Sequence, residues 1–292
     1  MVECSAILVA PAGRSALGAC VDALLPQADE IVVVHRGASA DAAPDLPESE
    51  KIILVSLPAD TGLGAALNAG AKAASADKAL VFIDPDCIPA ARAIEWLFKV
   101  MSAEPNIGAA GGLLLNLAGE QEQPGSRIVP PGALDTLAQA FGLKDPYTRP
   151  VAGDLPTSPA TVEALARHAL MIRKPVFEQI GGWNEDLRIE ATHLDLCDRI
   201  RQHGWRLLFV PGARFADFAD DTKKTAATTE TVQRFADRSR YYRAVPARRH
   251  TFAVNWLVIA LIWLGFSLWW IRHIATVLFH KASNAVSKAS RR

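Results

Sequence analysis

The stretch Val81–Pro89, VFIDPDCIP, decides the fold, because an apolar strand ends there in two carboxylates. Asp84 and Asp86 stand on either side of Pro85, whose ring fixes one backbone dihedral. Two carboxylates at this spacing can bind one hard divalent cation, since Mg²⁺ and Mn²⁺ prefer oxygen ligands and keep coordination positions for substrate phosphates. The alternative is a solvated turn, because Asp and Pro are both common in turns.

Short apolar runs alternate with segments of helical spacing on both sides of this stretch. The strands are expected at residues 5–11, 30–35, 51–58 and 79–85, and the helices at residues 16–27, 62–75 and 90–102. This alternation predicts a parallel sheet that is covered by helices on both faces. Because ligands of open α/β sheets bind beyond the carboxyl ends of the strands, we expect Pro11, His35 and the Asp84–Asp86 turn to lie close together.

The second half of the chain is less regular. Residues 118–160 are rich in Pro, Gly and Asp, with a short helix expected near residues 133–142. Further elements are expected as a strand and a short helix within residues 161–183, a helix at 194–204, a strand at 205–211 and a helix at 229–243. Gly204 ends one of these helices, since glycine readily adopts the left-handed conformation found just after a helix.

The composition of the 292-residue chain suits one large domain or one domain with an appendage. Lys plus Arg and Asp plus Glu number 31 each, so the overall charge does not indicate a nucleic-acid partner. The four cysteines form no CxxC pair, which favours reduced thiols over a zinc site or a disulfide framework. The N-terminus lacks a basic segment before its apolar run, so we expect a first strand there and not a signal peptide.

The segment Phe252–Ile271, FAVNWLVIALIWLGFSLWWI, contains no charged residue and is about as long as a bilayer-spanning helix, roughly 20 residues. It contains four tryptophans, and arginines stand on both sides of it. We therefore expect a globular domain at residues 1–245 and a membrane-associated helix with a basic tail at residues 246–292. The alternatives are a buried core helix and a helix that lies in the membrane interface.

A glycine-rich segment precedes the strand that ends in the two carboxylates. Asp60–Gly70, DTGLGAALNAG, places two glycines at the start of an expected helix and Asn68 within it. Glycines at such a point let the backbone approach a ligand closely, and the N-terminus of a helix favours anions. The segment is therefore a candidate for binding a phosphate group.

Four segments, in this order and at this spacing, resemble the family-2 glycosyltransferases of the GT-A fold, and above all their bacterial rhamnosyltransferase-like branch. They are GLGAALNAG at 62–70, FIDPDCIP at 82–89, MIRKPVFEQIGGWNEDL at 171–187 and LDLCDRIRQHGWRLLFVP at 194–211. The resemblance covers most of residues 5–245. It implies an α/β fold with a Rossmann-like mixed sheet and helices on both faces, followed by the hydrophobic C-terminal helix.

The resemblance implies a membrane-associated, inverting glycosyltransferase. It would move a sugar from a nucleotide-diphosphate donor to a lipid-linked or envelope glycan acceptor, at the cytoplasmic face of the inner membrane. Asp84 and Asp86 would bind Mg²⁺ or Mn²⁺ as the DxD motif of the family. The donor pocket would be lined by Pro11, His35, Asp60, Asn68 and Asp84.

Three motifs depart from the pattern of that family. The second strand ends in HRGASAD, so His35 stands where the family has an aspartate that binds the nucleotide. Arg167-His168 replaces a Gly-Ala pair that precedes MIRK. In the acidic E-D-x-D-L motif, Thr192 and His193 stand in place of both leading acids. His193 thus occupies the position of the general base, and an imidazole can take a hydroxyl proton because its usual pKa of about 6.5 lies near neutral pH.

These departures leave a second function open, a catalytically inactive glycosyltransferase-like subunit that binds or scaffolds at the membrane. A nucleotidyltransferase-like enzyme also fits the sheet, but the basic glycine-rich signature expected near the first strand is missing. Basic residues with tyrosines at 234–243, RFADRSRYYR, suit anionic lipid headgroups or a lipid-diphosphate acceptor. A solvated helix face explains the same segment equally well.

Overall fold

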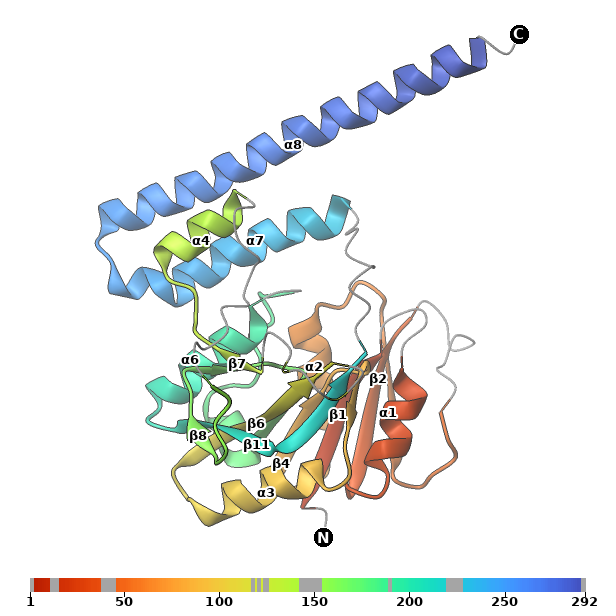
Figure 1. Ribbon diagram of the computed structural model, residues 1–292, viewed down its shortest axis with the longest axis vertical. Helices are drawn as coiled ribbons and strands as arrows, with labels where there is room; N and C mark the ends of the chain where they lie inside the picture. Colours follow the sequence, from red (N-terminus) through yellow and green to blue (C-terminus); the bar gives the residue numbers. More distant parts are fainter. Residues whose placement is uncertain are drawn as a thin grey trace. The chain divides into compact units, whose positions relative to one another are not determined.

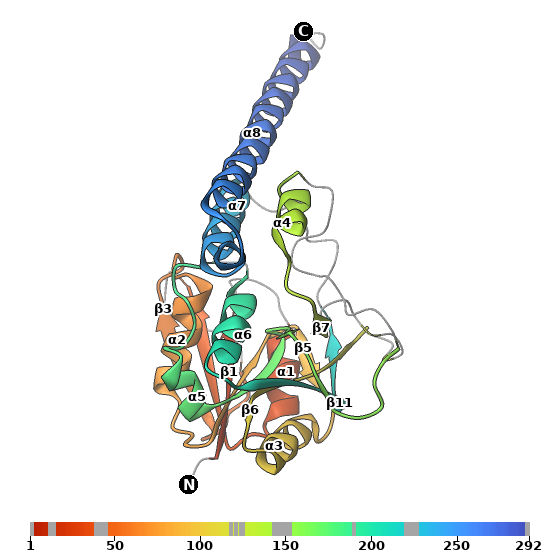
Figure 2. The ribbon, with the colours of Figure 1, turned by 90° about the vertical axis from the view of Figure 1, so that its left-hand side faces the viewer.

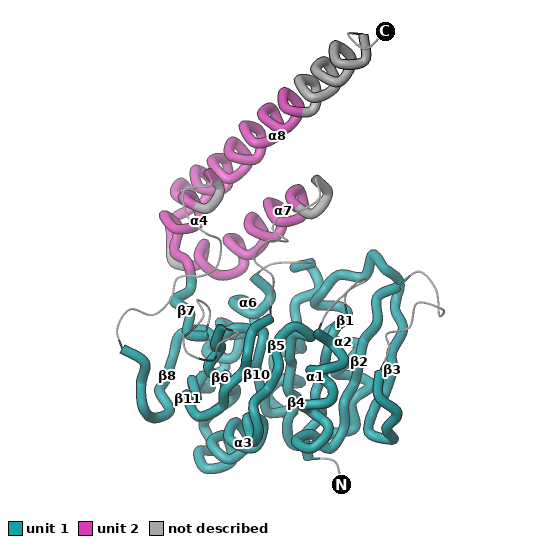
Figure 3. Tube along the Cα trace, turned by 45° about the vertical axis from the view of Figure 1, so that its right-hand side comes forward, with its two compact units in different colours: residues 1–130, 147–227 teal, residues 131–146, 228–292 magenta. Residues whose placement is uncertain are grey.

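A computed structural model gives the structure of the chain, and it describes residues 3–10, 16–37, 46–116, 119, 122, 126–141, 154–188, 191–218 and 228–289. The chain forms two compact units (Figure 3). Unit 1 comprises residues 1–130 and 147–227, and unit 2 comprises residues 131–146 and 228–292. The division predicted at residue 245 falls inside unit 2, and a separate membrane-associated part at 246–292 stays a prediction.

Unit 1 is built on one large sheet (Figure 1). Its strand order is β3-β2-β1-β4-β10-β6-β11-β5, with β8 paired to β11. Its strands are β1 (Cys4–Ala10), β2 (Glu30–Arg36), β3 (Ile52–Leu57), β4 (Ala79–Ile83), β5 (Cys87–Pro89), β6 (Ile107–Leu115), β8 (Ala160–Thr161), β10 (Ala169–Arg173) and β11 (Arg206–Asp217). A second, two-stranded sheet pairs β7 (Arg127–Ile128) with β9 (Ala164–Leu165).

The strands β3, β2, β1 and β4 run parallel, as the alternation of strands and helices predicted. β1, β2 and β4 are buried along almost their whole length, which explains why their sequences are continuous apolar runs. β10 then lies antiparallel between β4 and β6. The sheet is therefore mixed, as the resemblance implied, and the parallel arrangement predicted from the alternation holds for its first four strands.

Helices cover both faces of the sheet (Figure 2). On one face lie α2 (Leu63–Ala73), α5 (Lys174–Gln179) and α6 (Thr192–Gln202), and on the other lie α1 (Leu17–Leu24) and α3 (Ala93–Ala103). On the first face Arg199 of α6 donates hydrogen bonds to the carbonyls of Ile180 and Gly182, both 2.7 Å. On the second face the N–H of Ile94 in α3 donates to the side chain of Gln27, after α1 (3.2 Å).

β11 is longer than the predicted strand, which was expected to stop at Pro211. The register with β6 shifts in the segment after Val210, and pairing then resumes. At its end β11 pairs antiparallel with β5, where Asp217 lies opposite Cys87. The proline is tolerated because it sits in this irregular part of the strand. The extension brings Asp217 beside the turn that follows β4.

Unit 2 is helical. It contains α4 (Ala133–Ala140), α7 (Thr228–Ala244), the 3-10 helix η3 (Pro246–Arg249) and α8 (Phe252–Ala289). The helices expected near 133–142 and at 229–243 are confirmed as α4 and α7. The apolar segment forms the first part of α8, and the helix continues well beyond the predicted end at residue 271.

α7 and α8 pack side by side within unit 2. Phe235 of α7 contacts Phe266 of α8, with ring centroids 5.4 Å apart. Nearer the connection between the two helices, the Tyr242 hydroxyl donates a hydrogen bond to Oδ1 of Asn255 (3.0 Å). The core of the unit consists of Phe235, Tyr242, Val258 and Ile262. One side of the apolar segment is therefore buried against α7.

Candidate functional site

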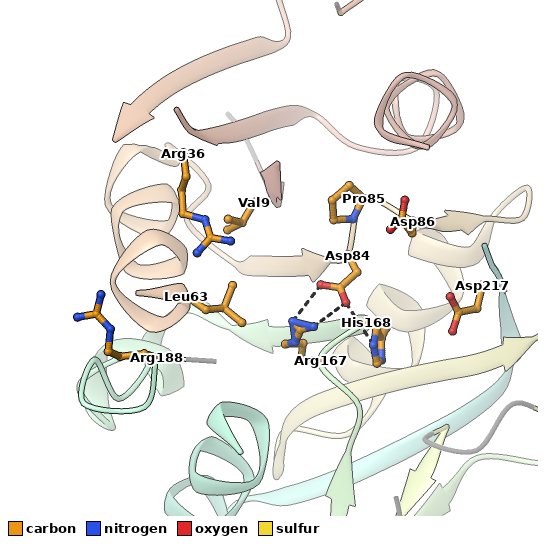
Figure 4. Close-up of a pocket in the computed structure, with 10 residues that line it drawn as sticks. All are labelled: Val9, Arg36, Leu63, Asp84, Pro85, Asp86, Arg167, His168, Arg188 and Asp217. Atoms are coloured by element: carbon orange, nitrogen blue, oxygen red, sulfur yellow. Dashed lines mark hydrogen bonds and ion pairs between the residues drawn. The ribbon is translucent and has the colours of Figure 1, made fainter. Parts of the chain in front are cut away.

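A cavity of about 390 Å³ opens at the carboxyl ends of the strands of unit 1 (Figure 4). It is lined by Val9, Arg36, Leu63, Asp84, Pro85, Asp86, Arg167, His168, Arg188 and Asp217. These residues come from β1, β2, α2, the turn after β4, the segment before β10, the segment before α6 and the end of β11. Segments far apart in the sequence thus meet at one edge of the sheet.

The DPD turn after β4 is held in place by backbone hydrogen bonds. The N–H of Cys87 donates to the Asp84 carbonyl (2.9 Å), and the N–H of Phe218 donates to the Asp86 carbonyl (2.8 Å). The N–H of Ala16 donates to Oδ1 of Asp86 (2.9 Å). The second carboxylate oxygen of Asp86 accepts no hydrogen bond among the described residues. The turn is therefore fixed by the fold and leaves one carboxylate oxygen available to a ligand.

Asp84 is bound by two basic residues that precede β10. Arg167 makes a two-point contact, with Nη1 3.2 Å from Oδ1 and Nη2 2.9 Å from Oδ2. Nε2 of His168 lies 3.2 Å from Oδ2. The strand register explains these contacts: Ala169 pairs with Ile83 across the antiparallel β10–β4 ladder, so the residues before it lie opposite the residue after β4.

Charges of opposite sign lie on opposite sides of the ion pair between Asp84 and Arg167. Figure 4 shows Arg36 and Arg188 on one side of Asp84, and Asp86 and Asp217 on the other. Carboxylates attract a cation, and guanidinium groups bind phosphate oxygens at two points. The arrangement therefore suits a cation and an anion that bind next to each other.

Two buried polar atoms of the cavity residues have no hydrogen-bond partner among the described residues, namely Nε of Arg36 and Nδ1 of His168. Arg36 is fixed by a hydrogen bond from Nη1 to the Thr61 carbonyl (3.0 Å). Burial, together with the charge of Arg167, lowers the pKa of Arg36 below its usual value. Buried polar atoms in folded proteins are nearly always hydrogen-bonded, so these two atoms are among the exceptions in the described part of the chain.

The structure places several predicted donor-binding residues away from the described wall of the cavity. Pro11 lies outside the described residues. His35 is buried in β2. Asn68 bonds the turn after α5: its Nδ2 donates to the Trp183 carbonyl (2.9 Å) and its Oδ1 accepts from the Trp183 N–H (2.8 Å). The donor-binding roles of Pro11, His35 and Asn68 stay predictions.

The cavity also contains residues that the sequence did not single out. Nη2 of Arg188 donates to the backbone carbonyl of Asp60, whose own side chain is exposed, so the predicted role of Asp60 also stays a prediction. Arg36 and Asp217 are the last residues of β2 and β11. The strand-end rule would have selected both had the two strands been predicted at their full length. No pattern in the sequence singled out Arg188.

His193, the predicted base, is the second residue of α6 and is not among the described cavity residues. Burial lowers its pKa to about 3, and the charges of Arg167 and His168 add to this effect, although part of the residue remains accessible. A neutral imidazole can accept a proton, but one with so low a pKa is a weak base. The buried Asp195, two residues on, forms an ion pair with Arg199 (2.8 Å). The role of His193 as base stays a prediction.

The carboxylates of the cavity fit a divalent cation that is shared with a phosphate ligand. Within the part of the chain that the structure describes, no group of three or more His, Cys, Asp or Glu could hold a metal ion alone. Mg²⁺ is usually held by one or two carboxylates and completes its coordination with phosphate oxygens and water. Asp86 and Asp217 would supply such a pair. Asp84 is engaged by Arg167, and the metal-binding roles predicted for Asp84 and Asp86 stay predictions.

The depressed pKa of His193 predicts a specific pH dependence of stability. Between about pH 6.5, its value in the unfolded chain, and about pH 3, the unfolded state binds a proton that the folded state does not. This contribution to the free energy of unfolding is fully present above about pH 6.5 and is lost as the pH falls through that window. We expect His193→Gln to reduce the slope of stability against pH between pH 5 and 6.5, measured by urea unfolding. An unchanged slope there, with parallel curves at all pH values, would contradict a neutral His193.

Comparison with known proteins identifies relatives of the chain. The L-rhamnosyltransferase of Mycobacterium tuberculosis named N-acetylglucosaminyl-diphospho-decaprenol L-rhamnosyltransferase, from the strains CDC 1551 / Oshkosh and ATCC 25618 / H37Rv, is 28% identical over 141 residues. That match covers 47% of this chain and 46% of the relative, so it spans about half the length of the curated relatives.

Solved structures show the same fold at low sequence identity. GalNAc-T7 with UDP, GalNAc and Mn²⁺ is 17% identical, with a TM-score of 0.61 over 84% of this chain and 47% of that chain. The mannosyltransferase PcManGT from Pyrobaculum calidifontis, in complex with GDP-Man and Mn²⁺, is 16% identical, with a TM-score of 0.53 over 98% of this chain and 81% of that chain. The predicted GT-A fold is therefore confirmed. The profile of glycosyl transferase family 2 matches residues 5–153, more than half of the chain, and the chain belongs to that family.

Proposed function

We propose that the chain is a membrane-associated, inverting glycosyltransferase that moves a sugar from a nucleotide-diphosphate donor to a lipid-linked or envelope glycan. The observation that carries the proposal is the cavity at the strand ends, with its three carboxylates and three guanidinium groups. Membership of family 2 supports it. So does the mycobacterial relative, whose name describes an L-rhamnosyltransferase that acts on a diphospho-decaprenol.

The charges of the cavity suit a donor that binds together with a metal ion. The charges of its three aspartates and three arginines sum to zero if His168 is neutral. A divalent cation then leaves two positive charges in excess, which the diphosphate of a nucleotide-sugar can balance. In this arrangement Asp86 and Asp217 would hold Mg²⁺ or Mn²⁺, and the two neighbours solved with Mn²⁺ support a divalent ion. When bound, the ion would stabilise negative charge on the departing diphosphate.

Transfer requires one bond to form while another breaks. The acceptor hydroxyl oxygen bonds to the anomeric carbon as the bond from that carbon to the diphosphate oxygen breaks, and the configuration inverts. The bonding electrons leave with the diphosphate, whose charge Arg36 and Arg188 can stabilise through two-point contacts. The hydroxyl proton passes to a base, for which His193 is the candidate because it is neutral and occupies the family's position.

A second candidate function rests on the contacts of Asp84. Arg167 and His168 both bind its carboxylate and would compete there with a metal ion. The weak basicity of His193 points in the same direction. A chain that keeps the fold but no longer transfers a sugar would act as a binding or scaffolding subunit at the membrane.

Donor binding tests the proposal through Asp86. Asp86→Asn keeps an oxygen for the N–H of Ala16 but removes the charge that would hold the metal ion. We expect donor affinity in Mn²⁺ to fall at least about tenfold, because a hydrogen bond or contact with a charged group contributes about 1.5–3 kcal/mol. Calorimetry with a panel of nucleotide-sugars, with and without Mn²⁺, measures this. Asp22→Asn removes the same charge from an exposed position on α1 and is the matched control.

Three outcomes decide between the candidates. If the unaltered protein binds none of the nucleotide-sugars, the enzyme proposal is wrong. Donor binding without transfer to any lipid-linked acceptor favours the non-catalytic subunit. Unchanged turnover in His193→Gln removes that residue as the base.

α8 supports the proposed membrane association. Residues Phe252–Thr276 form a helix that is long and apolar enough to cross a membrane by length and composition. Its exposed large apolar side chains are Phe252, Val254, Trp256, Leu257, Trp263, Leu264, Leu268, Trp270, Ile271 and Ile274. A soluble monomer rarely exposes so many large apolar groups along one element, and such a surface is typical of membrane contact.

We infer that this part of α8 lies in the membrane interface and does not cross the bilayer. Its other side packs on α7, which carries the fully buried Asp237, paired with Arg240 (3.2 Å), and the nearly buried Arg238. A spanning α8 would carry α7 into the hydrocarbon, where each charged residue costs about 2.5–3.5 kcal/mol. The cytoplasmic surface of the inner membrane is the proposed location.

Substitutions on the exposed side of α8 test this placement. Leu264→Gln together with Ile271→Gln should weaken binding to lipid vesicles at least about tenfold, because burying each apolar side chain contributes about 1.5–3 kcal/mol. Leu134→Gln, which alters an exposed leucine of α4, should leave vesicle binding unchanged. Flotation of the full chain with vesicles measures both.

A carbonate wash distinguishes the two membrane placements. It should release an interfacial protein from its membranes. Retention after the wash would favour a spanning helix instead, and a complete lack of vesicle binding would contradict membrane association altogether.

A further inference from the structure

Unit 2 contains a cavity of its own, of about 530 Å³, between α7 and α8. Arg234 and Arg238 from α7 and Arg272 from α8 line it, together with apolar residues that include Leu268 and Trp269. The proposed sugar transfer uses none of these residues. The cavity is also separate from the donor cavity, because its described lining belongs wholly to unit 2.

The polar part of this cavity is cationic. Its described lining contains three arginines and no Asp, Glu or His. Arg238 is only 6% exposed, and its guanidinium lies over the ring of Phe235, 5.1 Å from the ring centroid. The carboxylate of the neighbouring Asp237 pairs with Arg240 (3.2 Å) and accepts a hydrogen bond from Gln233 (3.0 Å). The described lining is therefore cationic, and guanidinium groups favour an anionic ligand such as a phosphate.

The apolar part of the cavity continues onto the exposed side of α8. Leu268 and Ile271 line the cavity and are also 47% and 63% exposed. Trp269 lines it beside them and contacts Phe235, with ring centroids 6.3 Å apart. A ligand can therefore hold an alkyl chain against α8 while its anionic group reaches the arginines. Such a ligand is an amphiphile.

We propose that this cavity binds the phosphate group of a membrane amphiphile. The guanidinium groups of Arg238 and Arg272 bind the phosphate oxygens, and Leu268 and Trp269 contact the first part of the alkyl chain. The volume lies in the range of ligand pockets, about 300–1,000 Å³. Two sources supply this chemistry, an anionic phospholipid and a polyprenyl diphosphate. The proposal rests on the membrane association proposed above and not on catalysis in unit 1.

Binding of a short amphiphile tests the site without a bilayer. The full chain in a non-ionic detergent is titrated by calorimetry with octyl phosphate, and with octyl glucoside as the neutral counterpart. Arg272→Gln, at an exposed position, and Arg238→Gln should each weaken octyl phosphate binding at least about tenfold. Arg243→Gln removes the same charge from an exposed position of α7 that does not line the cavity, and should weaken it less than about twofold.

Three results would overturn the proposal. The first is a loss of octyl phosphate affinity in Arg243→Gln as large as that in Arg272→Gln. The second is an affinity for octyl glucoside equal to that for octyl phosphate, and the third is no binding of octyl phosphate. Because Arg272 is exposed, its variant keeps the test valid even if Arg238→Gln fails to fold. Donor binding in unit 1 is measured separately and should be unchanged in all three variants, so a failure here is distinct from a failure of the proposed enzyme function.

Vesicles identify the source of the phosphate. Binding is compared on phosphatidylcholine alone and on the same lipid with either phosphatidylglycerol or a polyprenyl diphosphate, at equal phosphate charge. If Arg272→Gln weakens binding only to the polyprenyl diphosphate vesicles, the cavity binds the lipid-linked acceptor. If it weakens binding equally to both kinds of charged vesicle, the cavity binds phospholipid headgroups. If Arg272→Gln binds all three vesicle types like the unaltered chain, the phosphate site is excluded while membrane association stands.

Discussion

The antiparallel insertion of β10 between β4 and β6 is the constraint on which the site of unit 1 depends. It fixes Arg167 and His168 opposite the residue that follows β4, so Asp84 is already bound by a guanidinium and an imidazole. In the proposed site a divalent ion would be held by Asp86 and by Asp217, which the long β11 brings to the same turn. The direction of one short strand thus decides which basic groups contact Asp84.

Local patterns in the sequence predicted most of the fold of unit 1. The parallel strands were recognisable because strands buried on both faces are continuous apolar runs. The direction of β10 was not predictable, since its sequence ALMIR looks the same for either direction and its pairing is made with residues about 90 positions away. The length of β11 was missed because Pro211 normally ends a strand, and its irregular pairing there depends on β6.

Only part of the candidate site was predictable, because some of its residues form a local motif and others meet only in the tertiary fold. Asp84 and Asp86 form a compact motif, whereas Arg36 and Arg188 reach the cavity only through the tertiary fold. Asn68 is a motif residue that stabilises the fold, because its side chain packs closely against Gly182. Gly182 has φ +71°, and a Cβ atom added there would lie only 2.7 Å from Oδ1 of Asn68, so this position requires glycine. The glycine-rich segment and the later GGW segment therefore fit each other, independently of any ligand.

In the proposed function the cavity at the strand ends holds a metal ion only together with a nucleotide, because no group of three or more His, Cys, Asp or Glu among the described residues could hold the ion alone. Paramagnetic resonance of free Mn²⁺ tests this most directly, since the signal falls as the ion is bound. We expect the protein alone to take up little Mn²⁺ and to take up about one ion per chain when a suitable nucleotide-sugar is added. Equal uptake without a nucleotide, or no uptake with any nucleotide-sugar, would contradict a cation shared between Asp86, Asp217 and the donor.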